Sequence, residues 1–178
     1  MEKIKIFLAN RGHCSADDAV LMGEWVKLPI PQGKLEQVLA RLAINAEHGE
    51  YIISDFDTTM PNLKISEYTS ISEINALAEA LERLSEWEYT KLCAILEIEY
   101  EATEKVVQAY LAELCHFDLI PEVDSEMSLG EFCSECSGIF TNMPDIIREF
   151  FDFEKYGKFV HENGLGTFTS YGYLEDRR

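Results

Sequence analysis

The feature that most constrains the fold of this chain is a run of apolar residues at helical spacing within residues 65–86. Six of them recur at steps of three and four, which places them on one side of an α-helix: Ile71, Ile74, Leu77, Ala78, Leu81 and Leu84. Ser70 and Glu73 stand at the start of the run, at the spacing of a capping box. The pattern predicts a helix that begins near Ser70 and buries this side.

The same helix carries an acidic stripe. At about 100° per residue, Glu79, Glu82 and Glu86 fall on a second face, with only Arg83 nearby to offset them. Like charges at this spacing cost a few tenths of a kcal/mol per pair. Two interpretations stay open, namely a solvated helix face and a surface that binds a basic partner.

The charge of the whole chain favours the second interpretation. The 178 residues carry a net charge of −18, and the acids are concentrated in the last two thirds. Residues 1–65 hold nine acids and seven bases, residues 66–112 ten acids and three bases, and residues 113–178 fourteen acids and five bases. Such a chain repels phosphate backbones, so direct nucleic-acid binding is not expected. Its negative field steers it toward basic surfaces.

Composition indicates a folded protein of the cytoplasm. The hydrophobic content is 47%, the charged start lacks the apolar core of a signal peptide, and no long apolar run follows. Five cysteines, an odd number, do not suggest a disulfide framework. We expect reduced thiols and no membrane association.

The N-terminal third predicts a small ββαβ unit. Ile4, Ile6 and Leu8 alternate in a first strand, and Pro29 restricts a second strand to an edge or a terminus. The expected strands cover residues 3–8, 23–30 and 50–56, with a helix around residues 35–42. A connector near residue 62 ends this domain.

The middle third, residues 63–112, predicts a small acidic helical bundle. Helices are expected over residues 70–86, 87–96 and 103–111. Between the last two, Glu97, Glu99 and Glu101 alternate with apolar residues, and Glu104 follows. If this segment is extended, its acids share one side at a spacing of about 6.6 Å.

The last third, residues 113–178, predicts an acidic α+β unit. A strand over residues 114–120 stops at Pro121, and helices are expected over residues 129–136, from Pro144 through Phe151, and over 153–161. Residues 166–174 are aromatic and β-branched enough for one closing strand. The whole chain is therefore expected to be an α+β protein of three small domains, residues 1–62, 63–112 and 113–178.

Candidate chemical sites are weak. Cys133 and Cys136, with Cys115 upstream, could be drawn as a zinc site, but cysteines at i and i+3 of a helix are more often packing residues. Asp55 and Asp57 could be metal-binding carboxylates of a nuclease, but they lack a further acid or lysine at a recognisable distance. We therefore expect a protein that is not an enzyme, with no metal and no cofactor.

Several segments, in order and spacing, resemble the ArdA-type antirestriction proteins, which are acidic products of plasmids and conjugative transposons. The main one is Glu67-Tyr68-Thr69-Ser70-Ile71-Ser72-Glu73-Ile74-Asn75. The others are residues 7–12, 23–30, 50–56, 139–152, 156–158 and 166–168. The chain departs from the family pattern at Lys158-Phe159-Val160, where Arg-Asp-Leu is common, and at Asn142, where an acid is usual.

The resemblance implies both a shape and a function. It implies an elongated, curved molecule that dimerises through its C-terminal domain. It also implies a non-catalytic inhibitor that imitates bent B-form DNA and occupies the DNA-binding groove of type I restriction-modification enzymes, on their methyltransferase core. The alternative is an acidic adaptor or regulator of another basic protein, and a metal-dependent nuclease is a further one.

Two sets of residues are candidates for these contacts. The acids grouped in sequence are expected to contact the partner: Glu79, Glu82, Glu86, Glu97, Glu99, Glu101, Glu104, Glu113, Asp118, Glu122, Asp124 and Glu126. Residues 146–153 offer more large apolar side chains than one helical stripe can bury. Either the third domain uses them for its own core or they form a dimer interface through Ile147, Phe150, Phe151 and Phe153.

Overall fold

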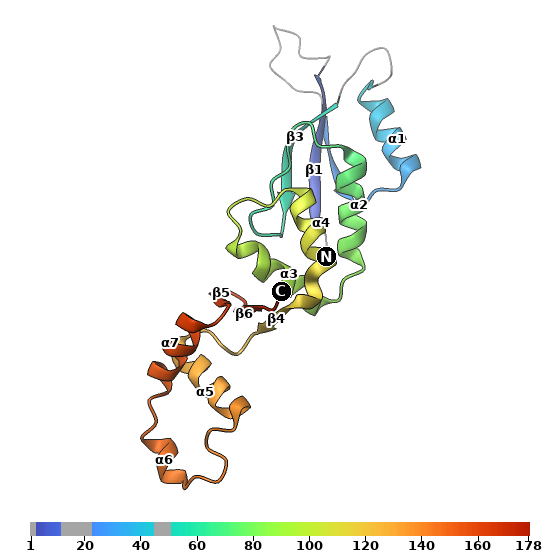
Figure 1. Cartoon of the computed structure of the whole chain (residues 1–178). Helices are drawn as coiled ribbons and strands as arrows, with labels where there is room; N and C mark the ends of the chain where they lie inside the picture. The colour runs from blue at the N-terminus through green and yellow to red at the C-terminus, as the bar shows by residue number, and fades with distance from the viewer. Residues whose placement is uncertain (1–2, 12–22, 45–50) are drawn as a thin grey trace. The chain divides into compact units, whose positions relative to one another are not determined.

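The computed structural model describes residues 3–11, 23–44 and 51–178, and it shows a mixed α+β protein, which confirms the predicted fold class (Figure 1). The chain divides into two compact units. The first unit comprises Met1–Ser85 and Tyr100–Ala109, and the second comprises Glu86–Glu99 and Tyr110–Arg178. The division into three domains stays a prediction.

The first unit is built on an antiparallel sheet of order β2-β1-β3. Its strands are β1 (Ile4–Asn10), β2 (Gly23–Leu28) and β3 (Tyr51–Thr58). Ile4, Ile6 and Leu8 are fully buried, as their alternation predicts. Helix α1 (Gln32–Arg41) lies between β2 and β3 in the chain, which gives the expected ββαβ order, and β2 is an edge strand.

Helix α2 (Ile71–Glu82) buries the predicted apolar side. It begins after Ser70, as expected, but the capping box is absent because the Ser70 hydroxyl lies 2.7 Å from the Ser72 hydroxyl and makes no cap bond. The amide of Glu73 donates to the Ser70 carbonyl instead, at 3.0 Å. The helix also ends earlier than expected, at Glu82.

Helices α3 (Glu86–Ile98) and α4 (Glu104–Glu113) follow. Residues 92–96 of α3 are all buried, because α3 packs against the sheet of the second unit. The segment after residue 96, whose acids would share one side if it were extended, is helical through Ile98, and Ala102 makes an isolated bridge to Leu63. Over a few residues, alternation of acids and apolar residues does not distinguish a strand from a helix end.

The second unit contains an antiparallel sheet of order β4-β6-β5. Its strands are β4 (Phe117–Ile120), β5 (Gly166–Thr169) and β6 (Gly172–Asp176). The predicted single closing strand is therefore a hairpin that turns at residues 170–171. Gly172 has a φ of +127°, and a Cβ there would overlap the carbonyl of Ile120, so this position requires glycine. Strand β4 begins later than predicted because residues 114–116 form a short 3₁₀ helix.

Helices α5 (Glu126–Ser137) and α7 (Phe153–Asn163) pack closely against each other. They approach at two glycines: a Cβ at Gly130 would overlap the carbonyl of Phe153, and one at Gly157 would overlap the carbonyl of Glu126. Helix α5 starts three residues earlier than predicted because Ser125 caps it, with its hydroxyl accepting from the Ser128 amide at 3.3 Å.

Between them lies α6 (Asp145–Glu149), which is shorter than predicted. Pro144 precedes it as the N-cap, and Phe150 and Phe151 follow its end rather than continuing it. The rings of Phe140, Phe151 and Phe153 form an edge-to-face cluster with centroids 5.0 to 5.9 Å apart. This cluster lies within the second unit.

Candidate partner-binding surface

The acids of α2 lie at the surface, as predicted. Glu79 and Glu82 are both exposed. The Asn75 side-chain amide donates to Glu79 at 3.1 Å, and the Asn75 oxygen accepts from the amide of Ile30 at 2.7 Å. Asn75 therefore links this face of α2 to the segment that follows β2.

The predicted stripe does not continue to Glu86. Since α2 ends at Glu82, Glu86 becomes the first residue of α3 and belongs to the second unit. It is exposed at the start of a helix, where a carboxylate is favourable because the helix N-terminus carries partial positive charge. A single helix therefore does not present all three acids.

Glu97 and Glu99 are half-buried and engaged inside the second unit. The Glu97 carboxylate accepts from the Ser170 amide at 2.9 Å and from the Ser170 hydroxyl at 2.5 Å, which ties α3 to the β5–β6 turn. Glu99 accepts from the Tyr110 hydroxyl, and this bond is the main cause of a raised Tyr110 pKa. Both carboxylates thus have structural roles.

Glu101 and Glu104 differ in exposure. Glu101 is exposed, whereas Glu104, the first residue of α4, is buried with only 9% of its surface accessible. A buried carboxylate cannot face a protein partner without a local opening. Glu101 therefore stays a candidate contact, and Glu104 does not suit that role.

The two arginines at residues 177 and 178 neutralise the next two candidates. Arg178 pairs with Glu113 at 3.0 Å and Arg177 pairs with Asp118 at 2.5 Å. Arg178 also pairs with Asp176 at 2.7 Å, and its hydrogen bonds lower the pKa of Asp176 and are in turn the main cause of a raised Arg178 pKa. Glu113 and Asp118 thus carry much less net field than the sequence suggests.

The segment before and within α5 holds three acids without a basic partner in the described part of the chain. Glu122 and Asp124 are exposed and Glu126 is half-buried. Asp124 accepts from the Ser128 hydroxyl at 3.2 Å, while the Glu122 and Glu126 carboxylates have no basic partner in residues 3–11, 23–44 and 51–178. These three residues come from one short stretch of the second unit and form a compact acidic group.

The sequence interpretation missed several exposed acids of the second unit. Their carboxylates also lack a basic partner within the described ranges: Glu131, Asp145, Glu149, Glu154 and Glu162. Grouping acids by closeness in sequence overlooked them because they are spread along three helices. The signal that could have found them is helical spacing, since each lies away from the apolar side of its helix.

The candidate dimer residues divide into two kinds. Ile147 and Phe150 are exposed, with 82% of Phe150 accessible. Phe151 and Phe153 are half-buried in the ring cluster with Phe140, where the Arg148 guanidinium lies 6.0 Å from the Phe153 centroid. The second unit thus uses some of these side chains for its own packing and leaves others at the surface.

The weaker chemical candidates gain no geometric support. No group of three or more His, Cys, Asp or Glu in the described ranges is placed to hold a metal ion. Cys133 and Cys136 are free thiols on α5, and burial raises the pKa of Cys133. Asp55 and Asp57 lie within β3, where Asp57 pairs with Lys5 at 3.4 Å. None of the helices in the described part of the chain is long and apolar enough to cross a membrane.

These features define a class of protein: an acidic α+β chain whose candidate site is a charged surface spread over several helices. A family model described as "Antirestriction protein (ArdA)" matches residues 13–175 of the 178. The chain therefore belongs to the ArdA antirestriction family, as the resemblance predicted, and this membership implies action against type I restriction enzymes. No curated protein matches the chain.

Proposed function

We propose that the protein is a non-catalytic inhibitor that presents carboxylates in place of DNA phosphates and occupies the DNA-binding groove of a type I restriction-modification enzyme. Such a role would be exercised in the cytoplasm, on the methyltransferase core of the enzyme. The observation that carries this proposal is the set of unpaired, exposed acids of the second unit in a member of the antirestriction family.

The electrostatics support a competitor of DNA. The second unit holds eighteen acids and only six lysines and arginines. Three of these bases are occupied by ion pairs with neighbouring acids, namely Arg148, Arg177 and Arg178. A DNA-binding groove lined with basic residues would attract such a surface as it attracts phosphates. Release of bound counterions would contribute to the binding free energy in both cases.

The proposed contact surface is narrower than the twelve acids expected from sequence. From the exposed acids that lack a basic partner, or that accept only from a neutral side chain, we assign seven to it: Glu79, Glu82, Glu86, Glu101, Glu122, Asp124 and Glu131. The half-buried Glu126, which opens α5, lies beside this group. The proposal leaves out Glu97, Glu99, Glu104, Glu113 and Asp118, because each is buried or is bonded to a side chain of its own unit.

A charge-reversal experiment tests this assignment. The double variant Glu122→Lys with Glu131→Lys should lose inhibition of the enzyme by about tenfold or more, because two attractions become repulsions. The control Glu36→Lys with Glu67→Lys changes the net charge equally at exposed positions of the first unit. Equal effects of the two variants would show that total charge, not this surface, decides binding.

A separate mutational experiment tests the acids of α2. Glu79→Gln with Glu82→Gln should weaken inhibition without lowering stability, because the change removes a like-charge repulsion within α2 and leaves an oxygen at residue 79 that can accept from Asn75. If this variant unfolds, the acids were structural. An adaptor of another basic protein would also bind through these acids, but DNA would then not compete for the same site on its partner.

We further propose that the protein forms a homodimer through the exposed apolar residues around α6. Ile147 and Phe150 are the accessible members, together with Met143 and Ile146. Apolar contact must outweigh repulsion between two acidic units, and salt screens that repulsion. Dimerisation should therefore strengthen as salt rises, opposite to partner binding.

Sedimentation of wild type and Phe150→Asp at low and high salt tests the dimer. Phe150 is the better site for this change than Phe151, because Phe151 belongs to the ring cluster and its loss would disturb the fold. The variant should be folded, monomeric and a weaker inhibitor. A wild-type protein that is monomeric throughout, or a dimer that salt dissociates, contradicts the proposal.

A further inference from the structure

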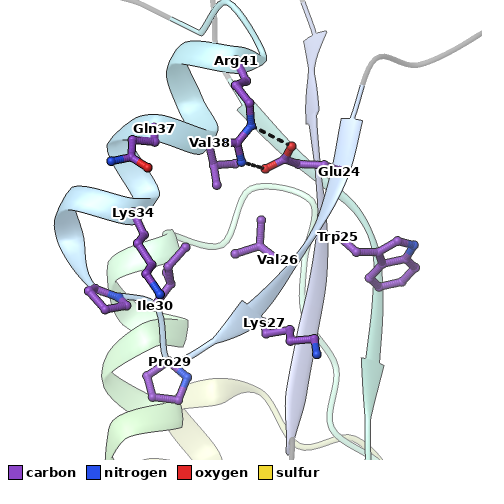
Figure 2. A pocket seen from close by; sticks show the side chains of 11 residues that line it. Glu24, Trp25, Val26, Lys27, Pro29, Ile30, Lys34, Gln37, Val38 and Arg41 are labelled. Atoms are coloured by element: carbon purple, nitrogen blue, oxygen red, sulfur yellow. Dashed lines mark hydrogen bonds and ion pairs between the residues drawn. The ribbon is translucent and has the colours of Figure 1, made fainter.

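A groove in the first unit differs in charge from the rest of the chain. It has a volume of about 490 Å³ and lies between β2 and α1 (Figure 2). On one side it is lined by four consecutive residues of β2, Glu24, Trp25, Val26 and Lys27, and by the segment that leads into α1. Its volume is within the range of about 300–1,000 Å³ typical of ligand sites.

The groove runs along the edge of β2 rather than over one face of the sheet. Successive side chains of a strand point to opposite faces, so a cavity lined by all four of residues 24–27 must follow the strand edge. Among the described strands, β2 pairs only with β1. Every second residue of such an edge directs its N–H and C=O away from the neighbouring strand, toward the groove.

Helix α1 supplies the opposite wall. Lys34, Val38 and Arg41 line the groove at steps of four and three, which is one face of the helix. Val26 and Val38 are buried and form an apolar floor. At one end Arg41 bridges to Glu24, with its Nη2 and Nε at 2.5 and 3.2 Å from the carboxylate (Figure 2). An edge strand facing a helix across an open groove is a geometry that accepts an added strand.

The charge of the lining decides what kind of strand would fit. Arg41 is paired with Glu24, the single acid of the lining, so the positive charge of the groove comes from Lys27 and Lys34. The Lys34 ammonium has no counter-ion within residues 3–11, 23–44 and 51–178. In a chain of net charge −18, a basic groove attracts acidic segments, which the acidic regions of the surface repel.

We propose that this groove binds an extended acidic segment of a partner protein, which adds as a strand to the edge of β2. Main-chain hydrogen bonds to β2 hold the segment, Val26 and Val38 contact its apolar side chains, and Lys34 contacts its carboxylates. Four residues of β2 provide about 10 Å of edge, enough for a four-residue contact. The groove shares no residue with the proposed DNA-mimic surface, so neither proposal depends on the other.

Fluorescence anisotropy with labelled octapeptides tests this proposal. The probe alternates glutamate and valine, a second peptide has lysine in place of glutamate, and a third carries N-methyl groups on alternate backbone nitrogens. The acidic peptide should bind with a Kd below about 1 mM, and the basic and N-methylated peptides should bind at least tenfold more weakly. No binding of the acidic peptide at that concentration overturns the proposal.

Two variants of the full chain locate the site. Lys34→Glu should weaken binding of the acidic peptide about tenfold, while the control Lys105→Glu, an exposed lysine on α4, should leave it unchanged. Gln37→Trp places a bulky ring at an exposed position of the groove wall and should abolish binding without unfolding the protein. Binding that survives both groove changes, or that falls equally with Lys105→Glu, contradicts the assignment. Both groove variants should inhibit the restriction enzyme like the parent.

Discussion

The two compact units differ in how they use charge and how they use glycine. The first unit carries fifteen acids and nine lysines and arginines, whereas the second carries eighteen acids and six. In the second unit, arginines 148, 177 and 178 are bound to particular acids, so much of its remaining charge is uncompensated. The comparison shows that the number of acids in a region overestimates the number available to a partner. Acids that are bound to a neighbouring base must first be subtracted.

The two units also differ in what surrounds their helical glycines. Gly33 in α1 has open space where its side chain would be, while Gly130 and Gly157 let α5 and α7 approach until their backbones touch. Helical glycine normally weakens a helix relative to alanine. At Gly130 and Gly157 this loss of helix stability is offset by the close packing of α5 against α7. At Gly33 no such packing offsets it.

The largest expected effect comes from breaking this glycine contact. Gly157→Ala should destabilise the second unit by about 3 kcal/mol or more, because the added methyl meets the backbone of α5 and not a side chain that can move. Gly33→Ala should instead stabilise the first unit by up to about 1 kcal/mol. Urea unfolding followed by circular dichroism measures both. Similar stability changes of the same sign would refute the contrast.

A smaller effect should follow from releasing the turn of the β5–β6 hairpin. Glu97→Gln keeps the shape of the side chain but loses the charge that accepts two bonds from Ser170, and should cost about 1 kcal/mol. Faster hydrogen exchange at the Ser170 amide would report the change. The control Glu131→Gln, an exposed acid on α5, should alter neither quantity. An unchanged Ser170 amide in Glu97→Gln would mean that Glu97 does not hold the turn.

The smallest effect concerns pH and the arginine at residue 178. Its hydrogen bonds lower the pKa of Asp176, so Asp176 favours the folded state above its unfolded pKa, and this contribution is lost as pH falls through the lower folded value. NMR titration of the Asp176 carboxyl should show the low pKa, and Arg178→Ala should raise it toward the ordinary range. A titration that Arg178→Ala leaves unchanged would assign the shift to another cause.

The sequence was sufficient to predict elements whose burial repeats with a simple period. Strand β1 and helix α2 are examples, because each has one face against a core, and that face alone fixes the spacing of Ile4, Ile6 and Leu8 or of Ile71, Ile74 and Leu77. The β5–β6 hairpin was missed because the Ser170–Tyr171 turn lacks the Asn-Gly or Asp-Gly pair that marks tight turns. The end of α3 was misjudged because its last turn alternates like a strand.

The candidate surface was harder to predict than the fold because the acids are bound to partners that lie far away in the sequence. Arg178 neutralises Glu113 from 65 positions away in the chain, and the Glu97 acceptor lies 73 positions from its donor Ser170. Rules based on residue spacing along one helix or strand cannot predict pairs this far apart in the sequence. The sequence could therefore identify the acidic regions, but only the structure separates carboxylates that hold the fold from carboxylates that are available to a partner.

The central claim is competition with DNA for one groove, and a direct test is a binding measurement on a purified type I methyltransferase core. The protein should bind the core without DNA, and a DNA duplex carrying the recognition site should displace it completely. Its affinity should fall at least tenfold between about 50 and about 200 mM salt. Binding that DNA does not displace, or an affinity that does not change with salt, would contradict the account.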